Sequence, residues 1–342
     1  MEELLAAGLA RQTSRGNLID PFRNRLMLPI HDESGRLVAF IGRAHPREVD
    51  ERTPKYQGSA TTDLFSKTDL PYGMTPDTID KLRRSASLAI VEGPMDALAV
   101  NAAARHAGRE LVAVAPLGTA LTAAQLATLD RIAPLADRGV VVALDNDPAG
   151  QRAAAAAHDL LLAAGVTVPR IPNLPAGQDP ADVLATAGVD ALATAIGRRR
   201  PLADLVVDQV LTAALRPGDH SAEGRLWALS RAARVVGRMP SEQRARQAVR
   251  VARALDLDSF QVLDSIQSHV PYDPKPQGPL GLPKPPRAMR QRAQLLADNA
   301  ARLNAIGSRR DATQAARRRR FVDDGRDEDR GAEVDRGADT DW

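Results

Sequence analysis

The sequence of 342 residues contains no cysteine. This absence excludes disulfide bonds, thiolate nucleophiles and every zinc site that is built on cysteine. No apolar run approaches the roughly 20 residues that a membrane-spanning helix needs. The first residues, MEELLAAGLARQ, carry acids where a secretory signal peptide has basic residues. We therefore expect a cytoplasmic protein that binds neither zinc nor a membrane.

Aromatic residues and lysine are scarce as well. Aromatic side chains make up 3% of the sequence, which leaves few surfaces on which the bases of a single strand could stack. Of the 46 basic residues only 5 are lysine, and arginine is the side chain suited to bidentate phosphate contacts. Sequences of high GC content are also rich in arginine and alanine, so the arginine excess alone does not indicate nucleic-acid binding.

Three nucleotide- or metal-binding motifs are also absent. The sequence has no GxxxxGK[ST] phosphate loop, no GxGxxG dinucleotide loop and no HExxH pair. These absences argue against an ATPase motor and against a zinc hydrolase.

Secondary-structure patterns divide the chain into five segments. We expect a small basic α+β subdomain at 1–84, an α/β domain at 85–198, a helical subdomain at 199–270, a proline-rich linker at 271–286 and a charged tail at 287–342. The α/β segment alternates short apolar strands with helices, which predicts a mostly parallel sheet flanked by helices. The tail is rich in arginine before residue 322 and in acids after it. Such charge blocks are typical of disordered segments that bind partners.

Acidic side chains follow the expected strands of the α/β segment. Glu92 ends the run SLAIVEG, Asp96 lies one helical turn later, Asp145 and Asp147 end VVVALDND, and Asp179 follows a fourth strand. Because ligands bind where parallel strands end, we expect these carboxylates to gather at one edge. Crowded carboxylates need protons or a cation, and oxygen ligands without histidine or cysteine favour Mg²⁺ or Mn²⁺. Such ions support phosphoryl or nucleotidyl transfer.

Ordinary structural roles remain open for several of these acids. Asp147 precedes Pro148 and has the position of a helix N-cap. Asp96 could complement the dipole of a helix that begins at Pro94, and Glu92 could simply end a strand at a turn. A capping role covers only one acid of the Asp145–Asp147 pair, so Asp145 needs another reason to follow a hydrophobic strand.

The stretches VEGPMD and LDNDPAG resemble the Toprim domain, which primases, topoisomerases and some nucleases share. The resemblance extends to bacterial replicative primases through FRNRLMLPIHDESGRLVAFIGR (22–43), PKYQGSATTDLFSKTDLPYG (54–73), LGTALT (117–122) and GQDPADVL (177–184). The helices expected at 201–270 are similar to the bundle that closes the primase core. The resemblance implies Mg²⁺-dependent synthesis of short RNA primers from ribonucleoside triphosphates on single-stranded DNA.

The resemblance also implies roles for individual residues. The catalytic and metal-binding carboxylates would be Glu92, Asp145 and Asp147. Asp96 and Asp179 would support metal binding. The residues that contact template or incoming nucleotide would be Arg23, Arg25, Lys55 and Lys67. The alternative for these four is that they are ordinary solvated basic residues. As phosphate contacts they would give salt-dependent binding with little choice of sequence.

The sequence departs from the family pattern at several places. Asn146 replaces the usual glycine within Asp-x-Asp, and we expect it to tolerate unusual backbone angles. Pro94 replaces an aromatic residue. In the late loop, GQDPADVL (177–184), Ala181 replaces a second acid of the family pattern, and Asp182 is a displaced candidate for that acid. The zinc-binding domain and the front of the primase core are missing from the sequence, so we expect initiation to require another polypeptide.

Two other functions stay open. A Toprim nuclease or topoisomerase would share the metal site, although Tyr56, Tyr72 and Tyr272 lie in poor contexts for a topoisomerase nucleophile. A non-catalytic factor that binds single-stranded DNA would retain the acidic pocket without using it. The helicase-binding domain of primases is replaced here by the linker and tail, and a helicase or another replication or mobilisation protein is a candidate partner.

Overall fold

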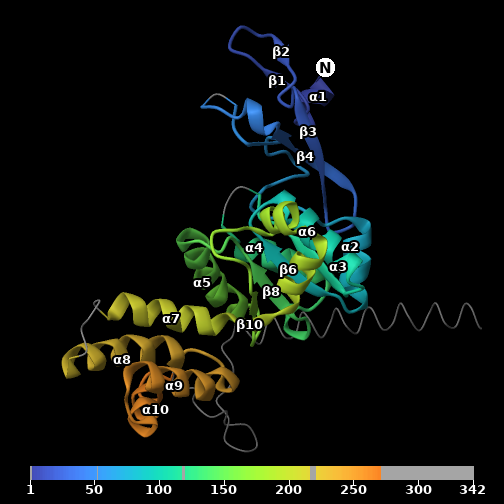
Figure 1. Ribbon diagram of the computed structural model, residues 1–342. Helices are drawn as coiled ribbons and strands as arrows, with labels where there is room; N and C mark the ends of the chain where they lie inside the picture. Colours follow the sequence, from blue (N-terminus) through green and yellow to red (C-terminus); the bar gives the residue numbers. More distant parts are fainter. Residues whose placement is uncertain (1, 52, 118–119, 216–220, 271–342) are drawn as a thin grey trace, which may run out of the picture. The chain divides into compact units, whose positions relative to one another are not determined.

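The computed structural model describes residues 2–51, 53–117, 120–215 and 221–270 (Figure 1). The chain divides into two units at Pro271, and the described residues all belong to the first. The linker and tail expected at 271–342 lie outside the described residues, as do the glycine and threonine of the LGTALT motif.

The amino-terminal part is built on a three-stranded antiparallel sheet of β3 (Arg25–His31), β4 (Leu37–Ala44) and β5 (Tyr56–Gly58). The turn between β3 and β4 is held by Asp32, whose Oδ1 accepts the N–H groups of Ser34 and Arg36. Gly35 has a φ of 80°, which favours glycine. The remaining elements here are α1 (Glu2–Ala6), β1 (Arg11–Gln12), β2 (Leu18–Ile19), the 3₁₀ helix η1 (Pro46–Glu48) and α2 (Pro76–Arg84).

The second sheet has five strands in the order β10-β9-β8-β6-β7. Its parallel strands are β6 (Ser87–Val91), β7 (Leu111–Val114), β8 (Val140–Ala143) and β9 (Arg170–Pro172). The edge strand β10 (Arg199–Pro201) is antiparallel to β9. Every residue of β7 and β8 is buried, as the apolar runs require of strands covered on both faces. The predicted fold class, a mostly parallel sheet flanked by helices, is confirmed.

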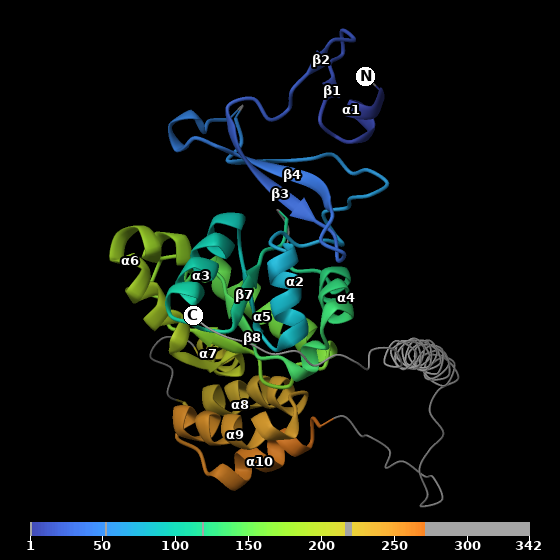
Figure 2. The ribbon, with the colours of Figure 1, turned by 90° about the vertical axis from the view of Figure 1, so that its right-hand side faces the viewer.

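Helices cover both faces of this sheet. One apolar core joins Ala89, Val91 and Val141 to α3 (Pro94–His106) and α6 (Pro180–Gly197). The other joins Leu88 and Ile90 to α2, α4 (Ala123–Ile132) and α5 (Pro148–Ala163). Figure 2 shows α3 and α6 on the left of the strands and α2 and α4 on the right. Alternate strand residues therefore face opposite layers, and the helix N-termini lie at the edge where the strands end.

A third core lies among α7 (Leu202–Ala214), α8 (Ala222–Gly237), α9 (Ser241–Leu255) and α10 (Ser259–Gln267). The buried carboxylate of Asp204 joins α7 to α9, because it accepts Arg246 Nη2 at 2.8 Å and Gln247 Nε2 at 2.7 Å. The short 3₁₀ helix η2 (Leu135–Asp137) precedes β8. Within the described ranges, no helix is both long and apolar enough to cross a bilayer.

Candidate functional site

The acidic site lies where β6 and β8 end. These strands are parallel neighbours whose last residues, Val91 and Ala143, lie side by side in the register. Glu92 follows β6 directly, and Asp145 follows β8 after one residue. Apart from Ser87, both strands consist of buried apolar residues, so the hydrophobic pattern that fixes the sheet also carries the two acids to one edge.

Three of the five predicted carboxylates converge most closely. Asp96, Asp145 and Asp179 each have an oxygen within 4.8 Å of the others'. The resemblance instead placed Glu92 and Asp147 beside Asp145 as the principal ligands and gave Asp96 and Asp179 a supporting part. Glu92 and Asp147 lie close enough for their charges to act on Asp145. The structure thus brings all five acids into one neighbourhood.

Asp96 is the carboxylate that organises the site. It is buried in the first turn of α3, where Oδ2 accepts the N–H of Gly93 at 3.0 Å. Its Oδ1 accepts the N–H of Ala181 at 3.2 Å, in the first turn of α6. One side chain therefore joins the loop after β6 to the start of a helix 85 residues later. These two hydrogen bonds give Asp96 a positioning role, and it also belongs to the group of acids that could hold a metal ion.

Asp147 and Asp179 are helix N-caps. Asp147 Oδ1 accepts the N–H of Gly150 at 2.7 Å, and Asp179 Oδ1 accepts the N–H of Asp182 at 2.5 Å. Capping satisfies donors that the first helical turn leaves free. The second oxygen of each carboxylate has no hydrogen bond within the part of the chain that the structure describes. Asp182 itself is exposed and contributes its main chain to this arrangement.

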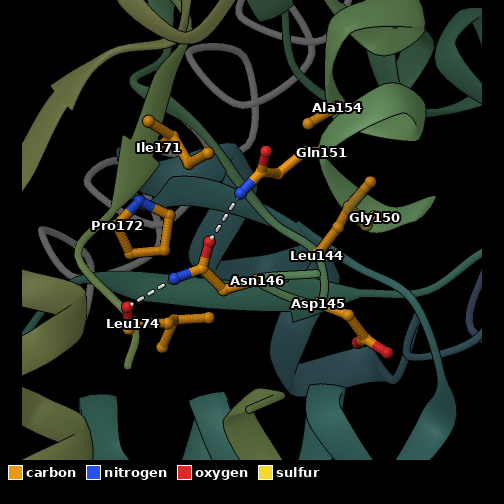
Figure 3. A pocket seen from close by; sticks show the side chains of 9 residues that line it. All are labelled: Leu144, Asp145, Asn146, Gly150, Gln151, Ala154, Ile171, Pro172 and Leu174. Atoms are coloured by element: carbon orange, nitrogen blue, oxygen red, sulfur yellow. Dashed lines mark hydrogen bonds between the residues drawn. The ribbon is translucent and has the colours of Figure 1, made fainter. Parts of the chain in front are cut away.

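Asn146 fastens the Asp145–Asp147 loop to the late loop (Figure 3). Its Nδ2 donates to the carbonyl of Leu174 at 2.8 Å, and its Oδ1 accepts from Gln151 Nε2 at 3.2 Å. Its main-chain carbonyl accepts the N–H of Gly177 at 2.9 Å. Asn146 does not have a positive φ, so the tolerance of asparagine for unusual backbone angles is not used here. What this position uses is the amide side chain, which points away from the Asp145 carboxylate.

Gly150 is required by a close approach of main chain to main chain. A Cβ atom at this position would overlap the carbonyl oxygen of Asp145. The first turn of α5 therefore packs directly against the Asp145 main chain. This packing fixes the position of Asp145.

Charge in the site is poorly compensated by the protein. Burial, followed by the charges of Glu92, Asp179, Asp96 and Asp147, raises the pKa of Asp145 to about 7. Burial and the charge of Asp179 raise the pKa of Asp96 to about 6. Among the described residues, neither Asp145 nor Glu92 receives a hydrogen bond or an ion pair through its carboxylate. Carboxylates of this kind fit a divalent metal ion, which would replace the missing positive charge.

A basic and aromatic group from the amino-terminal sheet lies beside the acids. Arg43 and Tyr56 are direct partners in the β4–β5 register, and Arg43 Nη1 donates to the Tyr56 hydroxyl at 2.5 Å. Lys55 Nζ lies 5.8 Å from the centre of the Tyr56 ring. The Tyr56 hydroxyl lies 3.8 Å from the point that a Cβ on Gly93 would occupy. Positive charge therefore approaches the loop that carries Glu92.

The other predicted basic residues lie in different settings. Arg25 Nη1 donates to the carbonyl of Pro54 at 2.8 Å and so holds the chain just before Lys55. Arg23 and Lys67 are exposed, and no contact in the described structure joins either side chain to the acids. Lys67 is held through its main-chain carbonyl, which accepts from Gln125 Nε2.

Sequence reasoning missed Arg43, and it considered Tyr56 only as a nucleophile. Both follow from strand register. The register of β5 against β4 is set across an irregular connection of about a dozen residues, from which no sequence pattern could be read. The stretches FIGR and PKY can be read in the sequence, but the pairing of the strands that contain them cannot.

Comparison with known proteins places these features in a family. Residues 1–77 match the family described as DNA primase catalytic core, N-terminal domain, and residues 89–184 match the Toprim-like family. The DNA primase of Deinococcus radiodurans is 38% identical over 232 residues, which cover 66% of this chain and 36% of that protein. The chain spans about a third of the length of the first curated relatives.

Two solved structures are similar to this chain over most of their length. The RNA polymerase domain of a Mycobacterium tuberculosis primase, in complex with double-stranded DNA, is 30% identical with a TM-score of 0.59. The match covers 75% of this chain and 78% of that one. A primase catalytic domain bound to single-stranded DNA is 28% identical with a TM-score of 0.60, and the match covers 76% and 77% of the two chains.

Proposed function

Since this chain belongs to the DnaG-type DNA primase family, we propose that it carries the site for metal-dependent synthesis of short RNA primers on single-stranded DNA. In this reaction the 3′ oxygen of one ribonucleotide bonds to the α-phosphorus of the next, and pyrophosphate leaves. The observation that carries the proposal is the cluster of carboxylates at the ends of β6 and β8, with Arg43 and Lys55 close by.

The residues divide this work according to their hydrogen bonds. Asp145 and Glu92, which lack protein donors in the described structure, would hold the metal ion together with the free oxygens of Asp147 and Asp179. A bound divalent ion offsets negative charge on the phosphate groups and on the attacking oxygen. Asp96 holds the loop after β6, which contains Glu92, to the first turn of α6, which follows Asp179.

The basic side chains would act on the nucleic acid and the nucleotide. Arg43 is held against Tyr56 and offers its remaining N–H groups to phosphate oxygens, for which the guanidinium fork is suited. Lys55 adds a point charge beside the same ring. Arg23, Arg25 and Lys67 are proposed as further contacts of the template backbone, with Arg25 also supporting the main chain before Lys55.

The decisive test is primer synthesis by the full chain. The protein is incubated with single-stranded template, Mg²⁺ and labelled ribonucleotides, beside an Asp145→Asn variant and an Asp264→Asn control at an exposed position of α10. Because initiation is expected to need another polypeptide, a short RNA primer is annealed to the template; we expect the wild type and the control to lengthen it, and Asp145→Asn to lose at least about 100-fold of this activity, because it removes a metal ligand. Metal-dependent cleavage of the template would support a nuclease. Template binding with neither reaction, unchanged in the variant, would support an accessory factor.

The proposal also covers which metal ion and which protein partners the chain binds. Mg²⁺ is the ion we propose, with Mn²⁺ as the alternative, because the available ligands are carboxylate oxygens. Parallel assays with each ion would separate them. A helicase or another replication or mobilisation protein stays a predicted partner, as does the cytoplasmic location, and co-purification with the full chain tests the first of these.

A further inference from the structure

Three arginine side chains gather at the edge of the five-stranded sheet opposite the acids. Arg109 precedes β7 and Arg170 begins β9, whereas Arg199 begins the antiparallel strand β10 and pairs with Pro172 at the end of β9. They line an open depression of about 470 Å³ together with Ser87, the first residue of β6. The acids follow the last residue of that same strand. The depression, which Ser87 lines, and the metal site therefore lie toward opposite ends of β6.

These guanidinium groups lack acidic partners. Within the described ranges, none of Arg109, Arg170 and Arg199 has a carboxylate oxygen within ion-pair distance, although Glu110 also lines the depression. Arg199 Nε donates to the carbonyl of Ile196 at 2.7 Å. Burial, and then the charges of Arg109 and Arg170, lower the pKa of Arg199. Like charges held together in this way leave an attraction for anions unsatisfied.

The head of one of these arginines lies against a glycine. The Arg109 guanidinium packs directly on Gly197, where the Cβ of any other residue would collide with it. Gly197 is the last residue of α6, and its lack of a side chain leaves room for the head of Arg109. Arg109 is exposed, and it lines the depression that Arg170 and Arg199 also line.

A second groove continues from the first. Arg109 and Leu111 line both, and the second, of about 360 Å³, adds Arg105, Lys81 and Asn101 along the edge strand β7. Lys81 forms an ion pair with Asp77 at 2.9 Å, whereas Arg105 has no acidic partner in the part of the chain described. Positive charges therefore follow one another from β9 around to the outer side of β7.

We propose that this track, defined as Arg105, Arg109, Arg170 and Arg199, binds the phosphodiester backbone of single-stranded nucleic acid outside the metal site. Three of these guanidinium groups line one depression and Arg105 lines the adjoining groove, so the four cover more surface than one small anion needs and can meet successive phosphates of a strand. The arginine depression has no aromatic side chain in its lining, and the aromatic side chain of the second groove, Tyr72, is buried, so we expect no base stacking along the track. Strand binding at the track requires neither metal nor ribonucleotides, and it is separable from primer synthesis.

The test is equilibrium binding of a fluorescent oligothymidylate of about 30 nucleotides to the full chain, in EDTA, over a series of salt concentrations. The variant Arg109→Gln/Arg170→Gln removes two charges from the track. The matched control Arg234→Gln/Arg253→Gln removes two charges from exposed positions on α8 and α9. If each arginine contacts one phosphate, the slope of log K against log salt falls by about 1.4, and affinity near 0.1 M salt falls roughly 25-fold.

The outcomes separate strand binding from its alternatives. Loss of slope in the track variant but not in the control, with the slope retained in Arg109→Lys/Arg170→Lys, supports the track, because lysine keeps the charge. An unchanged slope in a track variant that melts at the wild-type temperature overturns it. Tight binding of inorganic triphosphate that depends on Arg109 and Arg170, with strand binding unchanged, overturns it in favour of a small phosphate ligand. A catalytically dead Asp145→Asn variant that binds the strand normally leaves the track supported.

Discussion

Replacement of Asp145 by asparagine is expected to stabilise the metal-free protein, and the gain should grow with pH. The pKa of Asp145 is raised from 3.8 to about 7 in the folded state. A carboxyl group of this kind adds stability that is fully present below pH 3.8, and this stability is lost as the pH rises through 7. The asparagine side chain keeps the shape of the carboxyl group and never ionises, so the variant escapes this loss.

The size of the effect follows from the shift. At about 1.4 kcal/mol for each pH unit, a shift of roughly three units corresponds to an upper figure of about 4 kcal/mol. Asp145 is only partly buried, and solvent screening reduces this to about 1–2 kcal/mol. For a unit of this size, about 1–2 kcal/mol moves the melting temperature by roughly 3–6 °C. Saturating Mg²⁺ should remove the penalty in the wild type and leave the variant unchanged.

Thermal unfolding monitored by circular dichroism at pH 4, 5, 6, 7 and 8 in EDTA provides the measurement. The quantity of interest is the melting temperature of Asp145→Asn minus that of the wild type, because other titrating groups cancel in this difference. It should be near zero at pH 4 and reach its full value above pH 7. Asp264→Asn, at an exposed position, should show no such trend. A difference that is flat with pH, or that favours the wild type at pH 8, would refute the reasoning.

Two further predictions concern the framework of the acidic site and the packing of the helices that follow the sheet. Gly150→Ala should lower the free energy of unfolding by about 2–4 kcal/mol and abolish metal binding, because the new Cβ overlaps the Asp145 carbonyl. Calorimetric titration with Mn²⁺ beside urea unfolding checks it, with Ala149→Gly as a control in the same helical turn, and normal metal binding would contradict it. Asp204→Asn should cost about 1–2 kcal/mol, because the hydrogen bonds from Arg246 and Gln247 lose their charged acceptor while the half-exposed Arg246 stays solvated. Its urea midpoint should fall while Arg200→Gln, at the exposed Asp208 pair, changes little.

Much of the sheet and the placement of its acids could be predicted from the sequence. The apolar runs before Glu92 and Asp145 have the length and composition of buried parallel strands, and Pro94 and Pro148 mark where the following helices begin. From these signals alone the acids can be assigned to one edge. The N-cap role of Asp147, which the sequence left open, is present in the structure.

Other features depended on contacts that no local pattern contains. The pairing of Arg43 with Tyr56 depends on strand register, and β10 is too short to have a periodicity. Asn146 could be judged from the sequence only by its backbone tolerance, whereas its side chain is used to hold a loop 28 residues away. The two acceptor roles of Asp96 likewise require knowing that α6 begins next to α3.

The hydrogen bond from Ala181 to Asp96 uses the main chain, and this bears on how the site can change over time. Because any residue other than proline at position 181 supplies the same N–H group, its side chain can vary without releasing α6 from Asp96. An acid can be lost or regained there by a single substitution, which alters the charge offered to ligands and leaves the framework as it was. Position 181 thus lets selection adjust the electrostatics of the site independently of its architecture.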